Sequence, residues 1–517
     1  MRPLLERRAR RPVGRTPRRV ASFLTLTLVA AGPSGARALE PEITAETSAQ
    51  CYDVRSPTGE TIVPRRRLTS TLGVAAYDLM GARPWIVPDA AARGQGELLF
   101  RARLRYDADY GANPGEANPL DFDRNVPGFS RSPIDLMYGY VEGRRMLGGA
   151  FGFRLGRQYT TDALGWWSFD GAMARVTTPL YVAAEVLGGL EVRGGMPLSS
   201  PRFERDGVWR GDRSGFDRAA ALAFQPNEVA PAFGAALEST GLPWVHSRLA
   251  YRRVLNTGSS NVSLFEPRLT EPATFDRTRI SQERIGYAID GSAPTVGGGK
   301  AGLAYDLYAA RFTSLYASAD AFVTKRLTLS ADYDYFAPTY DADSIFNFFV
   351  SNPMNDLGLR ASFEATDTIS LAGGGGARLF QAETGPSNAS LLPAGDYPSN
   401  RTTFDGNGSF SARRRKGLNT QGLRVNALAG HEGHRAGGEL FAEHTVWART
   451  VLMGRASLYS WEDRLRPARA TESVGLVAGV GYRMSERART QLEFQLDTNR
   501  LVGVRGRMVL WFTVAAR

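Results

Sequence analysis

Cysteine is nearly absent from this chain: Cys51 is the only one in 517 residues, so no disulfide can form within it. A small secreted scaffold held together by disulfides is therefore excluded. Lysine is scarce too, with three residues against 60 arginines, a bias that a GC-rich genome can produce by itself. Beyond the short apolar run Val20–Ala31, the sequence has no candidate for a long apolar helix.

Signs of domain boundaries are also missing. Between Leu68 and Arg517 there is no Pro/Ser tract, no block of like charges and no change in the composition or patterning of residues. A soluble chain of this length is expected to divide into several domains. The uniformity therefore favours one large all-β unit.

Enzyme motifs are missing as well. The chain has no G-x-S-x-G element, no P-loop and no context for a cysteine nucleophile. A Ser–His pair with His246 or His444 as the base is the only hydrolytic arrangement left. We therefore expect a protein that is not an enzyme.

Metal and cofactor sites find little support. His431 and His434 are three residues apart in a Gly-bearing stretch, whereas a zinc helix needs histidines at i and i+4. Gly373–Gly376 is better explained as a strand lined by small residues than as a phosphate cradle, because no helix pattern follows it. We expect no cofactor and no metal. The carboxylates that could gather calcium in an outer loop without completing a calcium-binding pattern are Asp332, Asp334, Asp341 and Asp343.

The first residues have the pattern of a secretory signal. Met1–Arg19 contains eight arginines, Val20–Ala31 is apolar, and Ala36-Arg37-Ala38 is a small-x-small cleavage site. Twelve apolar residues are too few to cross about 30 Å of hydrocarbon as a helix, which needs roughly 20. We predict that residues 1–38 are a signal peptide cleaved near Ala38. They carry +8 of the formal charge of +11, so the mature chain is about +3 and nucleic-acid binding loses its main support.

Apolar and polar residues alternate along Met146–Arg193. In its first run Phe151, Phe153 and Leu155 share one face, opposite Arg154 and its polar or glycine neighbours. A strand sends successive side chains to opposite sides, so each run has one apolar and one polar face. A soluble sandwich would turn the apolar face inward, whereas a transmembrane barrel turns it toward lipid and keeps the charges in a wet lumen.

The same alternation recurs from Leu68 onward. Glu97–Asp107 places all of its charges on one face, opposite Phe100 and Leu104. Gly297–Gly299 and Asp405–Gly408 read as turns, and long polar breaks separate other runs. The further runs are Val245–Val254, Gln282–Asp290, Leu303–Phe312, Arg326–Tyr335, Leu357–Glu364, Ile369–Phe380, Leu423–Gly430, Glu439–Val446, Val451–Ser460, Val474–Arg483 and Arg489–Asp497. The long breaks are Gly111–Pro133, Gly194–Phe216, Asn256–Ser281, Pro338–Asn355 and Thr384–Arg401.

Short breaks interleaved with long ones suit a barrel with tight periplasmic turns and long outer loops. A sandwich would show continuous apolar core strands, which are not seen. We predict an all-β transmembrane antiparallel β-barrel of about 18 strands, with a range of 16 to 20, from the length available for strands of roughly 9–11 residues and their connections. Residues 39–67 are expected to be a periplasmic lead-in and residues 68–517 the barrel.

One short motif carries a family resemblance. Leu155-Gly156-Arg157-Gln158 is followed by Asp162 and then by Trp167-Ser168-Phe169-Asp170-Gly171-Ala172. This pair of segments resembles outer-membrane porins and, more narrowly, the alginate-export family, over about twenty residues. The resemblance implies an 18-stranded barrel with an arginine-lined lumen that passes an anionic polysaccharide. Most such barrels end in an aromatic residue that assists assembly, whereas Trp511 and Phe512 are set back from the C-terminus here.

A continuous row of arginines along the lumen, here called an arginine track, would suit an extended anion. Guanidinium groups donate to carboxylates or phosphates through two parallel hydrogen bonds. The alternative is that arginine is the general cation of this chain and pairs with lumenal Asp and Glu to stiffen the wall. The candidate lumenal residues are Arg101, Arg103, Arg105, Arg154, Arg157, Asp170, Arg175, Glu185, Arg193, Arg248, Asp332, Asp334, Arg360, Arg378, Arg424, Arg455, Arg505 and Arg507.

The sequence therefore predicts a channel in the outer membrane of a Gram-negative bacterium, for export or passage of anionic sugars or polysaccharide. A general or specific-solute diffusion porin is the first alternative, and an occluded barrel acting as an adhesin or enzyme is the second. Expected partners are outer-membrane lipid, the anionic solute, the barrel-assembly machinery and periplasmic export components. Nucleic acid is not expected as a partner.

Overall fold

A computed structural model describes residues 40–55, 61–77, 79, 96–109, 125–126, 134–192, 208–209, 229–242, 244–257, 278–339, 353–381, 402–431, 433–463, 470–501 and 503–516. The predicted signal peptide at 1–38, Arg193, Asp341 and Asp343 lie outside these ranges. Among the described residues, no helix is both long and apolar enough to span a bilayer.

The described chain is almost entirely β-strand. One 3₁₀ turn, Leu147–Gly149, interrupts it between β5 and β6. The strands are β1 Glu40–Arg55, β2 Thr61–Tyr77, β3 Glu97–Asp109, β4 Asn125–Val126, β5 Ile134–Met146, β6 Phe151–Asp162, β7 Gly165–Thr177, β8 Val182–Glu191, β9 Val208–Trp209, β10 Pro231–Ser239, β11 Val245–Asn256, β12 Arg279–Ala293, β13 Gly297–Asp306, β14 Arg311–Phe322, β15 Leu327–Phe336, β16 Met354–Glu364, β17 Ile369–Phe380, β18 Thr403–Lys416, β19 Asn419–Gly430, β20 Gly433–Trp447, β21 Thr450–Asp463, β22 Thr471–Arg483, β23 Ala488–Asn499 and β24 Gly503–Ala516.

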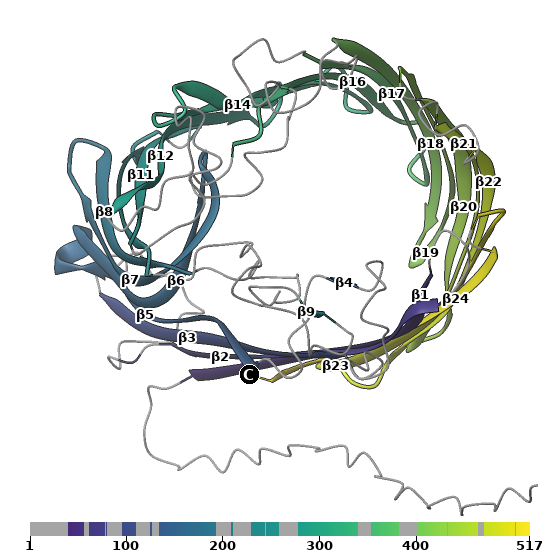
Figure 1. Cartoon of the computed structure of the whole chain (residues 1–517), viewed down its shortest axis with the longest axis horizontal. Coiled ribbons are helices and arrows are strands. Elements are labelled where there is room, and N and C mark those ends of the chain that lie inside the picture. Colours follow the sequence, from purple (N-terminus) through teal and green to yellow (C-terminus); the bar gives the residue numbers. More distant parts are fainter. Residues whose placement is uncertain are drawn as a thin grey trace, which may run out of the picture. The chain divides into compact units, whose positions relative to one another are not determined.

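These strands close into one antiparallel barrel. Its sheet has 22 strands, each paired with its neighbours in chain order, while the short strands β4 and β9 pair only with each other. The first and last strands close the ring, from the Ile43–Ala516 pair to the Tyr52–Arg507 pair, and Figure 1 shows the ring viewed along the barrel. The closed antiparallel sheet confirms the predicted all-β barrel. Closure also leaves no strand of this sheet with an unpaired edge.

The predicted strand number of about 18 was wrong. Residues 39–67, expected to be a lead-in, supply β1 and the first part of β2, which pair with each other from Glu40–Tyr77 to Arg55–Thr61. The barrel therefore begins at Glu40 rather than at Leu68. Several connections are also shorter than the average that the prediction assumed, so more strands fit into the same length.

Glycine-rich segments caused two further errors. Gly297–Gly299 and Asp405–Gly408, expected to be turns, lie within β13 and β18. Leu303–Phe312, expected to be one run, is the end of β13, a four-residue turn and the start of β14. Glycine is tolerated inside these strands because both neighbours pair with them along their length. Gly373–Gly376 does lie in a strand, β17, as predicted.

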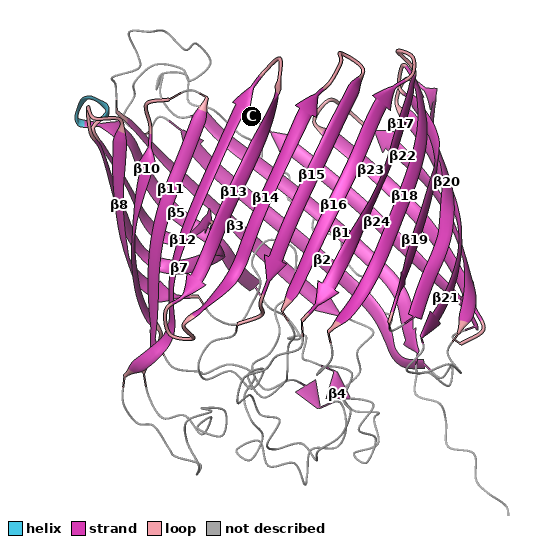
Figure 2. Cartoon of the chain, turned by 90° about the horizontal axis from the view of Figure 1, so that it is seen from above, coloured by secondary structure: helices cyan, strands magenta, loops and turns pink. Residues whose placement is uncertain are grey.

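The two ends of the barrel differ. At one end every connection except β2–β3 has five residues or fewer, and both Glu40 and Ala516 lie at this turn end. Figure 2 shows its short turns along the upper edge, beside the C-terminus. Apart from β2–β3, the long connections are at the opposite, loop end: β3–β5, β8–β10, β11–β12, β15–β16 and β17–β18. The predicted alternation of tight turns and long loops is confirmed.

Candidate functional site: the lumenal face

The strand pairing assigns every side chain to one of two faces. Directly paired residues of an antiparallel sheet point to the same side. One such row runs through Asp334, Asp356, Arg378 and Asp405 on β15–β18. Another row runs through Arg455, Val477, Gln495 and Arg507 on β21–β24. The polar face is therefore continuous from strand to strand.

Contacts that skip a strand show that this polar face is the lumenal one. Side chains converge only on the concave side of a curved sheet, where they can reach past their immediate neighbour. Arg103 on β3 contacts Glu46 on β1 at 2.5 Å. Arg248 on β11 contacts Glu185 on β8 at 2.6 Å. Asn426 on β19 likewise donates to the Tyr459 hydroxyl on β21 at 3.2 Å.

The opposite face is apolar and exposed. Leu155, Val186 and Phe494 have 51%, 59% and 52% of their surface accessible, although they are large hydrophobic residues. Their paired neighbours on this face are apolar too: Ala172 beside Leu155, Ala174 beside Val186 and Met508 beside Phe494. Such exposure would be unfavourable in water, and it matches the orientation expected from the sequence.

Most candidate residues lie on the lumenal face, but three do not meet the prediction. Arg157 and Asp170 pair directly with each other on the outer face, because Gln158 and Phe169 beside them point inward. Their assignment to the lumen was wrong. Arg193 lies outside the described residues. The pairing places the others on the lumenal face: Arg101, Arg103, Arg105, Arg154, Arg175, Glu185, Arg248, Asp332, Asp334, Arg360, Arg378, Arg424, Arg455, Arg505 and Arg507.

Carboxylates accompany the lumenal arginines of β2–β13. Arg105, almost fully buried, contacts Asp135 at 3.0 Å, and Arg67 contacts Asp107 at 2.6 Å. Arg101 differs, because it contacts the hydroxyl and the ring of Tyr77 instead. Arg378 on β17 also has a close carboxylate partner, Asp356. These arginines are largely neutralised by the wall itself. The remaining pairs of this kind are Arg144–Glu142, Arg154–Glu142 and Arg284–Asp306.

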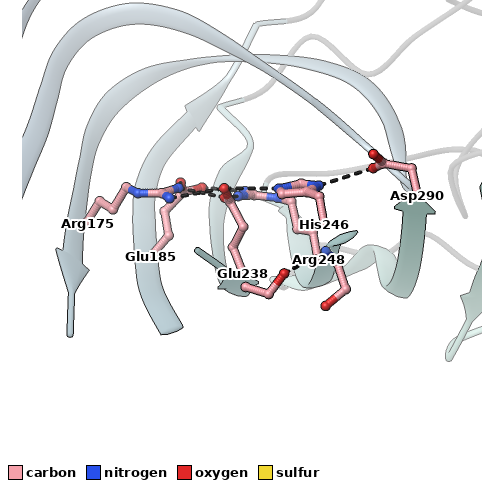
Figure 3. Close-up of polar contacts among 8 residues, drawn as sticks. Arg175, Glu185, Glu238, His246, Arg248 and Asp290 are labelled. Atoms are coloured by element: carbon pink, nitrogen blue, oxygen red, sulfur yellow. Dashed lines mark hydrogen bonds and ion pairs between the residues drawn. The ribbon is translucent and has the colours of Figure 1, made fainter. Parts of the chain in front are cut away.

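Six of these lumenal groups join into one network near the turn end, drawn in Figure 3. Arg175 contacts Glu238 at 2.6 Å, and Arg248 contacts both Glu238 and Glu185, at 2.8 and 2.6 Å. His246 lies between two carboxylates, with Nε2 3.2 Å from Glu238 and Nδ1 3.2 Å from Asp290. The histidine is thus part of a charge network and contacts no serine hydroxyl among the described residues. The sequence did not single out Glu238 or Asp290.

A second arc of the lumenal face has arginines without such partners. In the described part of the chain no ion pair involves Arg360, Arg413 or Arg489, on β16, β18 and β23. Arg424 and Arg455 share the single carboxylate Glu439, at 2.8 and 3.8 Å. This arc therefore holds guanidinium groups without an ion pair, but it also holds lumenal carboxylates, including Asp332, Asp334 and Asp405.

The motif that carried the family resemblance forms three consecutive rungs between β6 and β7. Gly156 pairs with Gly171, Arg157 with Asp170, and Gln158 with Phe169. Gln158 and Phe169 are completely buried on the lumenal side. The motif is thus a local ladder rather than two separate sites. We call these six residues the motif ladder.

Beyond the motif ladder, the β6–β7 hairpin leaves both neighbouring strands. The last rung to β5 joins Arg157 to Gly139, and the last rung to β8 joins Phe169 to Glu191. The hairpin from Gln158 to Phe169 then crosses to strands further round the ring, and Figure 1 shows β6 and β7 reaching inside it. Leu164 at the tip packs in a buried cluster with alanines of β10, β11 and β13.

The inner wall is shaped to receive this tip. Ala236, Ala250, Gly286 and Ala304 form one paired row across β10–β13. A Cβ on Gly286 would lie 2.7 Å from the Leu164 side chain, so the glycine lets the leucine pack against the wall in this position. Arg252 donates to the Leu164 carbonyl at 3.2 Å and lies 5.1 Å from the Trp167 ring centre, while Trp167 and Phe169 stack in a second cluster that includes β10 and β11.

A large cavity of the described structure, about 770 Å³, lies toward the turn end. Its lining includes lumenal side chains from strands far apart in the ring: Glu46, Arg103, Glu443, Arg489 and Trp511. The wall curves sharply here, since β3 and β20 contribute to one hollow. No three His, Cys, Asp or Glu side chains come together as metal ligands within the described ranges.

Comparison with known proteins adds little to this site. No protein-family model and no curated protein matches the chain, so the alginate-export resemblance gains no support from them. Among solved structures, Acinetobacter baumannii OccAB4 has 7% identity over 94% of this chain and 100% of that chain, with a TM-score of 0.42. The outer membrane protein OpdK from Pseudomonas aeruginosa has 11% identity over 92% and 98%, with a TM-score of 0.41. Pseudomonas aeruginosa OccK2 (OpdF), in complex with glucuronate, has 10% identity over 92% and 97%, with a TM-score of 0.41. Identities and TM-scores this low transfer no function or substrate to this chain.

Proposed function

We propose that this chain is an outer-membrane channel through which polar solutes diffuse. The single observation that carries the proposal is the division of the closed wall into two faces, a charged lumenal face and an exposed apolar outer face. A closed barrel pairs every strand edge, which is the condition for a sheet to lie in lipid. A wet, charged interior is what a diffusing polar solute needs.

The outer membrane of a Gram-negative bacterium is the location this proposal requires. Short turns, the start of β1 and the end of β24 lie at one rim, and most long connections lie at the other, which is the arrangement of outer-membrane barrels. The signal peptide proposed at residues 1–38 would deliver the chain there. Lipid and the barrel-assembly machinery are the partners that follow from this location.

A channel of mixed charge is better supported than a pure anion track. In β2–β13 lumenal arginines lie within ion-pair distance of carboxylates, as Arg103 does with Glu46 and Arg248 with Glu185. Neighbouring charges of opposite sign cancel at the distance of a passing solute, particularly when salt screens them. The hairpin tip at Leu164 also occupies part of the barrel interior, which favours small solutes over a thick polymer.

Passage of anionic sugars or polysaccharide is the second candidate, and one observation favours it. Arg360, Arg413 and Arg489 have no ion pair among the described residues, and Arg424 and Arg455 share one carboxylate. Unpaired guanidinium groups can donate to a carboxylate on a solute. These guanidinium groups would then bind anionic solutes on their way through the channel.

Single-channel recording in planar bilayers tests the proposal. We expect discrete conductance steps from the refolded protein, and a modest anion preference under a salt gradient that fades at molar salt. Addition of oligomeric uronate should reduce the current only if anionic sugars enter. Protein shown to be folded that gives no conductance would contradict the proposal and favour an occluded barrel that acts as an adhesin or enzyme.

A further inference from the structure

The proposed function leaves the motif ladder unexplained. Its central pair, Arg157 and Asp170, points away from the lumenal row and cannot contact a solute as the lumenal arginines can. Its flanking pairs, Gly156–Gly171 and Gln158–Phe169, bring no charge. Yet the ladder lies at the point where the β6–β7 hairpin separates from β5 and β8.

The two glycines permit a close approach of strands at this point. Gly156 has φ of +122°, a conformation that residues with a Cβ rarely adopt. A Cβ there would lie 2.3 Å from the Gly139 carbonyl oxygen, and a Cβ on Gly171 would lie 2.1 Å from that of Gly188. Both contacts are with backbone and cannot be relieved by a rotamer change. The glycines therefore let β6 and β7 turn away from their neighbours where they do.

Arg157 ties three strands together at the same level. Its Nε and one terminal nitrogen donate to the two oxygens of Asp170 on β7, both at 2.7 Å, and the other terminal nitrogen donates to the Leu136 carbonyl on β5 at 3.0 Å. A two-pronged contact of this kind fixes the relative orientation of its partners as well as their distance. The pair is thus placed to hold the base of the hairpin.

We propose that the motif ladder anchors the hairpin inside the barrel, and that Arg157 and Asp170 are positioning residues that thereby set the width of the channel. The tip has its own contacts, Leu164 in the alanine cluster and Arg252 on the Leu164 carbonyl. These contacts can form only if the hairpin leaves the wall at the correct angle. This inference rests on the proposed channel function.

The experiment compares single-channel conductance of Asp170→Asn and Arg157→Gln with that of the starting protein. Loosening the base should let the tip leave the inner wall, so we expect a larger and noisier conductance. The charge-swapped variant Arg157→Asp with Asp170→Arg should recover part of the original value. Arg253→Gln is the matched control, because Arg253 and Glu283 are also a directly paired outer-face couple, at 2.5 Å, but on β11 and β12.

A cross-link separates a change in hairpin position from general weakening of the barrel. Leu164 at the tip packs in one buried cluster with Ala250 on β11, so cysteines at these two positions would face each other. In a Cys51→Ser background, Leu164→Cys with Ala250→Cys should therefore lock the tip under oxidising conditions. Added to Asp170→Asn, the oxidised cross-link should restore the original conductance, and reduction should remove it again.

The outcomes distinguish the two proposals. A folded starting protein without conductance overturns the channel function. A conducting protein in which Asp170→Asn behaves like Arg253→Gln overturns the anchoring role of the ladder. The anchoring role is also overturned if Asp170→Asn raises the conductance but the cross-link does not lower it again. The higher conductance would then not arise from movement of the hairpin.

Discussion

Loss of three lumenal arginines should change the ion preference of the channel. Replacing Arg101, Arg103 and Arg105 together with serine removes three positive charges from one arc of the lumenal face. Arg103 is now within 2.5 Å of Glu46, and Arg105 within 3.0 Å of Asp135. Both carboxylates lose these partners in the variant. The arc therefore changes from nearly neutral to net negative, and cations should gain over anions.

The size of the effect follows from distance and screening. Three unit charges about 8 Å from a passing ion contribute about 1.6 kcal/mol in water, and screening at 0.1 M salt reduces this to about 0.7 kcal/mol. That energy is roughly a threefold change in the local concentration of each ion, upward for cations and downward for anions. The permeability ratio of cation to anion should therefore rise about tenfold.

The zero-current potential under a salt gradient measures this ratio directly. At low salt the zero-current potential of the variant should shift in the direction of cation preference. At 1 M salt, where the Debye length is about 3 Å, this shift should nearly disappear. Arg253→Gln serves as a control that removes an arginine from the outer face. An unchanged potential in a folded, conducting triple variant would mean that these arginines do not face the conducting space.

Three further predictions concern the wall itself. In a Cys51→Ser background, Leu329→Cys should react with membrane-soluble maleimide and Asp334→Cys with the aqueous reagent, because the two lie on opposite faces of β15; reversed labelling would contradict the face assignment. Glu185→Gln should lower the free energy of unfolding in urea by about 1.5–3 kcal/mol, because Arg248 loses one of its two charge-assisted contacts and keeps only Glu238; a loss below about 0.5 kcal/mol would show that the network is dispensable. Gly171→Val should reduce the fraction of heat-modifiable, folded barrel, since its side chain would collide with the Gly188 carbonyl, and normal folding yield would refute the close approach.

The alternation of apolar and polar residues with a period of two supplied most of what could be predicted from the sequence. Charged residues on one face of Glu97–Asp107 and apolar ones on the other predicted strands, their faces and a barrel. The same alternation also predicts the face on which Arg157 lies. Arg154 and Gln158 point inward, so Arg157 between them should have been assigned to the outer face. Glu238 on β10 could have been found by the same reasoning.

Other features depend on contacts that no local pattern reports. β18 contains Asp405-Gly406-Asn407-Gly408, which by composition is a turn, but two full-length neighbours hold it as a strand. The inward path of the hairpin depends on Leu164 meeting Ala236 and Ala304, which are about seventy or more positions away along the chain. Contacts at such separations leave no periodicity in the sequence, so the strand number and the hairpin position could not be predicted.

The seam between β1 and β24 has a consequence for how the molecule is made. Arg507 donates to Gln50 at 2.7 Å across 457 positions of sequence, so the ring cannot close until the last strand has been synthesised. Bringing ends that far apart together costs roughly 5 kcal/mol of chain entropy. Until then both terminal strands present unpaired backbone, which readily adds a strand from another molecule. A chain shortened before Gly503 would keep those edges open for good and should accumulate as edge-to-edge aggregates.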